Sequence, residues 1–156
     1  MRIRELERGD SDRIRELILE LYDENPAYST FGHRPDEGEL EGVISGKLRG
    51  IAAGSIIDLV AVDDGRIVAE CELVGTEPGR GVIGIMVEAR SRRKGLGGEL
   101  VSRAMRLAAG RGLAKAYANV RRENWRALKF FRACGFTEEA GAEGEIVVMS
   151  KGASAA

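Results

Sequence analysis

The stretch Val82–Glu99 constrains the fold of this chain more than any other. Its apolar run, Val82–Val87, is typical of a buried strand. A basic segment, Arg90–Lys94, follows, and then come Gly95–Gly98 and an apolar periodicity that predicts a helix. The first turn of a helix leaves amide N–H groups without partners and carries the positive end of the helix dipole. This strand–loop–helix unit therefore predicts a site for an anion, most often a phosphate.

Two common phosphate-binding motifs do not match this loop. A Walker loop needs G-x-x-x-x-G-K-[ST], which no stretch of the sequence supplies. The dinucleotide fingerprint needs a third glycine at the position of Leu100, after Gly95 and Gly97. What remains is Arg92-x-x-Gly95-x-Gly97, directly after a strand. A basic, solvated loop before an ordinary helix is the simpler interpretation of the same residues.

Length and composition narrow the class of protein. The 156 residues are enough for one core, and we expect a single domain over residues 1–151 with a flexible tail, 152–156. A formal net charge of −1 argues against a nucleic-acid partner. The N-terminus is too charged for a signal peptide, and no apolar run approaches the roughly 20 residues that span a bilayer. Two cysteines give no disulfide framework, so we expect a cytoplasmic protein without a membrane partner.

The remaining patterns predict a mixed α/β fold. Helices are expected from Asp10 or Ser11 to Tyr22, over Asp36–Leu48, from the glycine loop to Ala109, and from Asn124 to Gly135. Strands are expected over Arg2–Leu6, Ile56–Val62, Arg66–Val74, Val82–Val87, Lys115–Val120, Phe136–Ala140 and Glu145–Met149. The tight turn at Asp63-Asp64-Gly65 joins the second strand to the third. The order β-α-α-β-β-β-α-β-α-β-β predicts a mixed sheet with helices on both faces.

A second motif lies downstream of the glycine loop. It reads Asn124-x-x-Ala127-Leu128-x-Phe130-Phe131-x-x-x-Gly135-Phe136. Together with the first motif and the element order, it resembles the GNAT superfamily of N-acetyltransferases over nearly the whole chain. The resemblance implies a mostly antiparallel central sheet that is splayed in the middle. It also implies acetyl-CoA as co-substrate, no metal, and by analogy a homodimer.

The resemblance assigns cofactor-binding roles position by position. Met86 and Val87 match the strand segment whose main chain pairs with the pantetheine arm. Asn124 matches an asparagine that hydrogen-bonds the pantetheine region, although a plain helix cap explains it equally well. Phe131 stands where many members carry a tyrosine that protonates the leaving thiolate. The diphosphate loop and the helix start are matched by Arg92, Arg93, Lys94, Gly95, Leu96, Gly97, Gly98 and Glu99, with the amides of Arg93 to Gly98 holding the diphosphate.

The catalytic groups are less clear. Acetyl transfer to an amine needs a base for the ammonium proton and a proton for the thiolate. Phe131 has no proton to give, which leaves Tyr117 or Cys134, water, or an unassisted thiolate. Glu70 and Glu72 share one face of a predicted strand, and we expect Glu72 to be the base, unless both face solvent.

The expected function is acetyl transfer from acetyl-CoA to a primary amine, on a small molecule or a lysine side chain, by direct attack in a ternary complex. A non-catalytic acyl-CoA-binding or regulatory module of the same fold is the alternative. A phosphate-binding domain for another nucleotide is a third interpretation of the basic loop.

Overall fold

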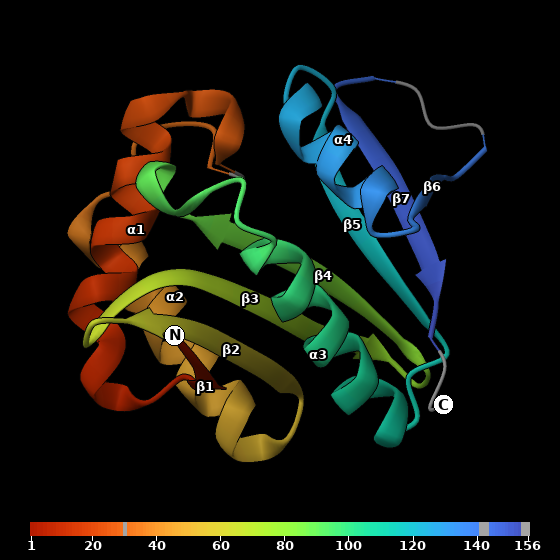
Figure 1. Cartoon of the computed structure of the whole chain (residues 1–156), viewed down its shortest axis with the longest axis horizontal. Helices are drawn as coiled ribbons and strands as arrows, with labels where there is room; N and C mark the ends of the chain where they lie inside the picture. The colour runs from red at the N-terminus through yellow and green to blue at the C-terminus, as the bar shows by residue number, and fades with distance from the viewer. Residues whose placement is uncertain (30, 141–143, 154–156) are drawn as a thin grey trace.

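The computed structural model describes residues 1–29, 31–140 and 144–153 of the chain. Within these residues, seven strands form one sheet in the order β1-β2-β3-β4-β5-β7-β6 (Figure 1). The strands are β1 (Arg2–Glu5), β2 (Ile56–Asp63), β3 (Arg66–Glu77), β4 (Arg80–Val87), β5 (Lys115–Arg121), β6 (Thr137–Glu138) and β7 (Ile146–Gly152). The α-helices are α1 (Ser11–Glu24), α2 (Glu37–Ala53), α3 (Leu96–Gly110) and α4 (Trp125–Ala133). The predicted element order and the mixed α/β class are confirmed.

Helices cover both faces of the sheet, as predicted. Ile14, Leu17, Ile18 and Leu21 of α1 are buried, and the first three form one core cluster with residues of α2, β2 and β3. The larger cluster lies on the opposite face, where α3 and α4 pack on the sheet. In Figure 1, α3 crosses in front of the central strands and α2 lies behind them.

Several boundaries differ from the prediction because tertiary contacts extend the elements. α2 continues past Leu48 to Ala53, since Gly50 lets the helix lie directly on Ile56. A Cβ at Gly50 would lie 2.2 Å from Cδ1 of Ile56. β3 and β4 also pair through most of Gly75–Gly81, the interval between the two predicted strands, which leaves only Pro78 and Gly79 between them.

The C-terminal hairpin is confirmed in its pairing but not in its bounds. Thr137 pairs with Ser150, so β6 and β7 are antiparallel. β7 reaches Gly152, one residue into the segment expected to be a flexible tail. Residues 141–143, where the turn is predicted, and 154–156, in the predicted tail, lie outside the described residues.

The sheet is split between β4 and β5. β4 pairs antiparallel with β3 up to Val87, but its parallel ladder with β5 covers only three pairs, the last being Val82 with Tyr117. β5 then continues against β7 as far as Arg121. Figure 1 shows the two strands diverging towards their carboxyl ends. The splayed centre that the family resemblance implies is present.

Among the described residues, no helix combines the length and the hydrophobicity that crossing a bilayer requires.

Candidate active site

The glycine loop joins the end of β4 to α3, beside the split in the sheet. Its backbone turns sharply at Arg93 and Gly95, whose φ angles are +64° and +75°. Gly95 is well suited to the left-handed region, whereas Arg93 is held there at an energetic cost. The amides from Gly95 to Gly98 donate to no hydrogen-bond acceptor in the described part of the chain. Four adjacent free donors at a helix N-terminus form a site for an anion such as a diphosphate.

The basic side chains of the loop divide into two groups. Arg92 turns back to the protein, where its Nε donates to the carbonyl of Val87 at 3.1 Å and its guanidinium binds both carboxylate oxygens of Glu24 at 2.6 and 2.7 Å. The pKa of Glu24 is therefore held below its ordinary value. Arg93 and Lys94 are exposed and form no ion pair with any described residue. They, rather than Arg92, are free to approach phosphate groups.

Gly97 has a packing role as well as a backbone one. A Cβ there would lie 2.8 Å from Cε1 of Phe130 in α4 and 3.7 Å from Val87 at the end of β4. Gly97 thus lets the first turn of α3 lie against the aromatic ring of α4. Phe130 belongs to the second sequence motif, but its contact with Gly97 could not be predicted, because the two residues lie 33 positions apart and no local pattern links them. Leu96 is buried in the core, and exposed Glu99 pairs with Arg103.

A small group of charged side chains links the end of α1 to the glycine loop and to α4. Glu24, at the end of α1, binds Arg92 of the loop and Arg126 of α4, the latter at 3.4 Å. The guanidinium of Arg126 stacks on the ring of Tyr28, 3.8 Å from its centroid. Arg121, at the end of β5, donates to the carbonyls of Ser29 and Phe31. These contacts place the segment that follows α1 over the face of the sheet that α1 and α2 also cover.

Part of that face is left uncovered by helices. Cross-strand neighbours share a face, so Glu72 lies on it beside Gly84. Tyr117 and Asn119 lie on the same face across the split, by the register of β4 with β5 and by strand alternation. Gly84 and Asn119 are exposed. We call Glu72, Gly84, Tyr117 and Asn119 the open strip; it is the side from which an acceptor can reach the split.

The shared face of Glu70 and Glu72 is confirmed, but Glu70 does not face solvent. Glu70 is 3% exposed, whereas the side chain of Glu72 is 27% exposed. Both bind the ammonium group of Lys47 from α2. His33, the one histidine of the sequence, is exposed and pairs with Glu39.

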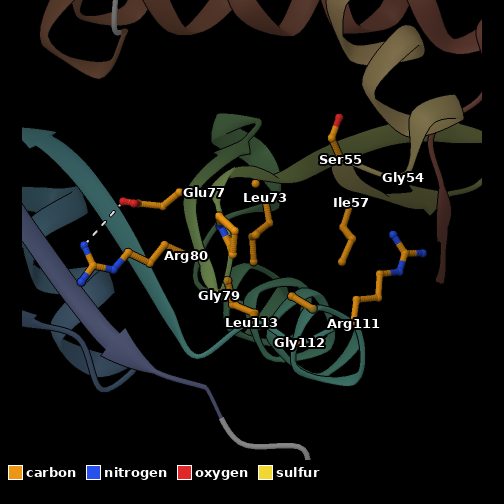
Figure 2. A pocket seen from close by; sticks show the side chains of 13 residues that line it. Gly54, Ser55, Ile57, Leu73, Glu77, Gly79, Arg80, Arg111, Gly112 and Leu113 are labelled. Atoms are coloured by element: carbon orange, nitrogen blue, oxygen red, sulfur yellow. Dashed lines mark hydrogen bonds and ion pairs between the residues drawn. The ribbon is translucent and has the colours of Figure 1, made fainter.

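Two pockets lie outside this arrangement. A cavity of about 220 Å³ lies at the opposite ends of β4 and α3, between Ser55, Leu73 and Leu113 (Figure 2). Its polar rim holds the ion pair of Glu77 with Arg80. A second, of about 350 Å³, lies between α1 and the residues just after β4. Neither contains the free amides or the open strip.

The comparison with protein families decides the identity of the fold. The model of the acetyltransferase (GNAT) family matches residues 3–136. This chain belongs to the GNAT acetyltransferase family. No curated protein matches the sequence significantly.

Solved structures of GNAT proteins share the whole fold at low sequence identity. A PaiA N-acetyltransferase from Thermoplasma acidophilum, in complex with coenzyme A, is 20% identical, with 97% of this chain and 98% of that chain covered and a TM-score of 0.77. A ribosomal-protein-alanine N-acetyltransferase from Brucella melitensis is 18% identical, with 97% and 99% covered and a TM-score of 0.79. A spermidine N-acetyltransferase from Vibrio cholerae, in complex with CoA and spermine, is 21% identical, with 97% and 95% covered and a TM-score of 0.76.

The second GNAT motif contributes less directly to the site. The side-chain oxygen of Asn124 accepts from the amide of Ala127 at 3.1 Å, so Asn124 is a helix cap whose amide group remains for a ligand. Phe131 is 3% exposed and packs edge-to-face on Phe130 and Phe136, with ring centroids 5.2 Å apart in each pair. The ring predicted to lie at the cofactor is therefore a core side chain in this structure.

The two substitutes for the missing tyrosine differ in position. Tyr117 lies on the open strip, where the split begins. Cys134 packs against the core on the other face, and burial raises the pKa of its thiol. Only Tyr117 is placed where an acceptor can approach.

Proposed function

We propose that this GNAT protein transfers the acetyl group of acetyl-CoA to a primary amine, of a small molecule or a lysine side chain, by direct attack in a ternary complex. The observation that carries the proposal is the row of free amides from Gly95 to Gly98, directly beside the split between β4 and β5. That row suits a diphosphate, and the unpaired edge of β4 suits an extended amide-bearing arm.

The described residues fit the co-substrate. The amides of Gly95 to Gly98 would hold its diphosphate, with Arg93 and Lys94 supplying positive charge at the rim. The main chain of Met86 and Val87 would bind its pantetheine arm, and the Asn124 amide would donate to it. Bound acetyl-CoA supplies the activated acetyl thioester.

Two residues of the open strip carry the proton transfers in this proposal. Glu72 accepts the proton of the acceptor ammonium and leaves a neutral amine to attack the acetyl carbonyl. The hydroxyl of Tyr117 is the group best placed to return a proton to the departing thiolate. The role of Glu72 is supported by its side chain, which is 27% exposed on the open strip.

The test is acetyl transfer to spermidine, to a lysine peptide and to an alanine-terminated peptide, followed as release of free CoA thiol. We expect Glu72→Gln to lower kcat about 100-fold, the usual contribution of a general base, with the KM for acetyl-CoA unchanged. Glu77→Gln is the matched control, since Glu77 lies on the same strand and is exposed. Equal turnover in Glu72→Gln and wild type would remove Glu72 as the base.

A non-catalytic acyl-CoA-binding module remains the alternative, favoured by the replacement of the usual tyrosine by Phe131. Acetyl-CoA binding without thiol release for any of the three acceptors would support it. We also propose a cytoplasmic location, supported by the free thiols of Cys71 and Cys134.

A further inference from the structure

A buried charge cluster lies directly behind Glu72. Nζ of Lys47, in α2, donates to Asp58 of β2 at 3.3 Å and to two carboxylates of β3, Glu70 at 3.1 Å and Glu72 at 2.5 Å. Lys47 is 7% exposed, Asp58 is fully buried and Glu70 is 3% exposed. These four residues, which we call the Lys47 cluster, join α2 to two central strands next to the open strip.

The charges of the Lys47 cluster do not balance if every group is ionised. Three carboxylates would then face one ammonium in a buried site, where an unpaired charge is very costly. Oδ1 of Asp58 and Oε2 of Glu70 receive no donor from the described residues. A buried carboxylate oxygen without a donor is costly, and among the described residues only Lys47 donates to the side chains of this pair. One proton on Asp58 or Glu70 would remove one of the excess negative charges and give the pair a donor of its own, so the geometry favours a pair that holds one proton.

The number of N–H donors on Lys47 also explains how it holds Glu72. An ammonium has three N–H donors, and those of Lys47 are all used by the three carboxyl groups. One of them fixes Oε2 of Glu72. Oε1 of Glu72 has no hydrogen-bond partner among the residues described, and it belongs to the only member of the cluster with substantial exposure. One oxygen is therefore fixed and the other is available to an incoming ammonium.

We propose that Lys47 is a positioning residue that holds Glu72 for proton transfer, and that Asp58 and Glu70 hold Lys47 in place by sharing one proton. The proposal rests on the proposed role of Glu72 as base. The proton balance is simple: the acceptor ammonium loses one proton, Oε1 of Glu72 gains it, and the shared proton of the pair stays in place. Burial, followed by the charge of Glu70, raises the pKa of Asp58 to about 9, which agrees with a proton held at neutral pH.

The first test needs no acceptor. Asp and Glu side-chain carboxyls are labelled with ¹³C in the full protein, and the shifts of Asp58 and Glu70 are followed with pH. We expect one ionisation of the pair near pH 9, and we expect Asp58→Asn and Glu70→Gln each to abolish it. Asp12, whose side chain is 96% exposed, is the internal reference. Ionisation of both carboxyls below neutral pH would overturn the shared proton.

The second test uses turnover of whichever of the three acceptors is acetylated. Lys47→Met should lower kcat about tenfold, leave the KM for acetyl-CoA unchanged and move the rising limb of the pH–rate profile to higher pH, since Glu72 loses the neighbouring positive charge. Arg49→Met, an exposed position of the same helix, is the control. A lower kcat or Tm with an unmoved pH midpoint would mean that Lys47 is merely structural.

The two proposals fail in different ways. Absence of transfer to all three acceptors, together with a carboxyl pair that ionises near pH 9, counts against the proposed function and leaves the shared proton supported. Transfer with an unshifted pH profile in Lys47→Met, or a pair that ionises early, counts against the Lys47 cluster alone. If Lys47→Met does not fold, the carboxyl titrations of Asp58→Asn and Glu70→Gln still decide whether the pair shares a proton, and early ionisation of both carboxyls would overturn the proposal.

Discussion

At the scale of single residues, Asp58 gives the stability of the fold a pH dependence of known sign. Its pKa is about 9 in the folded protein against an ordinary 3.8, so the folded state binds a proton that the unfolded state releases. The contribution of this proton to the free energy of unfolding is complete below pH 4, declines by at most about 1.4 kcal/mol per pH unit, and is lost by pH 9. Asp58→Asn keeps nearly the same side-chain shape but removes the ionisable carboxyl group.

We therefore expect Asp58→Asn to gain stability relative to wild type as the pH rises from 6 towards 9, measured by urea unfolding at each pH. Asp12→Asn, an exposed position in α1, should run parallel to wild type. A constant difference between Asp58→Asn and wild type across this range would contradict the raised pKa of Asp58.

The residues of this cluster show how far sequence reasoning reached. Strand alternation correctly placed Glu70 and Glu72 on one face. Lys47 was missed, although it follows buried Leu40 and Ile44 at helical spacing. Asp58 was missed within the apolar run of β2. Each is a charged residue at a position where the local pattern predicts a buried apolar side chain. Only the packing of α2 on the sheet shows that Lys47 and Asp58 contact each other.

At the scale of elements, the contact between α3 and α4 depends on Gly97 but not on the neighbouring Gly98. Gly97 would bring a Cβ to within 2.8 Å of the Phe130 ring, whereas a Cβ at Gly98 meets nothing within 4 Å. Gly97→Ala should lower the free energy of unfolding by about 1–3 kcal/mol through overpacking, and Gly98→Ala should raise it by up to about 1 kcal/mol through helix propensity. Urea unfolding of both variants without ligand checks this, and equal stability would place Phe130 away from Gly97.

Element boundaries were harder to predict than element identities. Local periodicity found all four helices and the hairpin at Asp64 and Gly65, whose positive φ angles fit the predicted turn. α2 was predicted to end at Leu48, but it continues to Ala53. Gly50 in fact allows the close contact with Ile56 that stabilises the last turns. A tertiary contact of this kind leaves no local signal.

At the scale of the whole molecule, the site combines the anion-binding loop with the split between β4 and β5. The sequence predicts these two features to different degrees. The anion-binding loop could be predicted from strand, glycines and helix alone, and its free amides agree with that prediction. The split between β4 and β5 came only from the family resemblance, because a parallel ladder that stops after three pairs has no sequence pattern. The roles of Arg92 and Phe131 could not be predicted either, since each side chain is committed to a distant partner, Glu24 or the core.

The loop and the split together predict a ligand-dependent stability that can be isolated with one pair of variants. Acetyl-CoA at 100 times its dissociation constant should stabilise the wild type by about 2.7 kcal/mol and raise Tm by roughly 5–10 °C, while ATP should not.

Gly98→Asp puts a carboxylate beside the free amides, in open space and at the favourable end of the helix dipole. Its Tm without ligand should therefore be unchanged or higher, whereas the shift with acetyl-CoA should disappear. Gly98→Asn has nearly the same shape without the charge and should keep most of the shift. An equal shift in both variants, or a shift with ATP, would place the co-substrate elsewhere, because only a diphosphate at these amides is repelled by the charge alone.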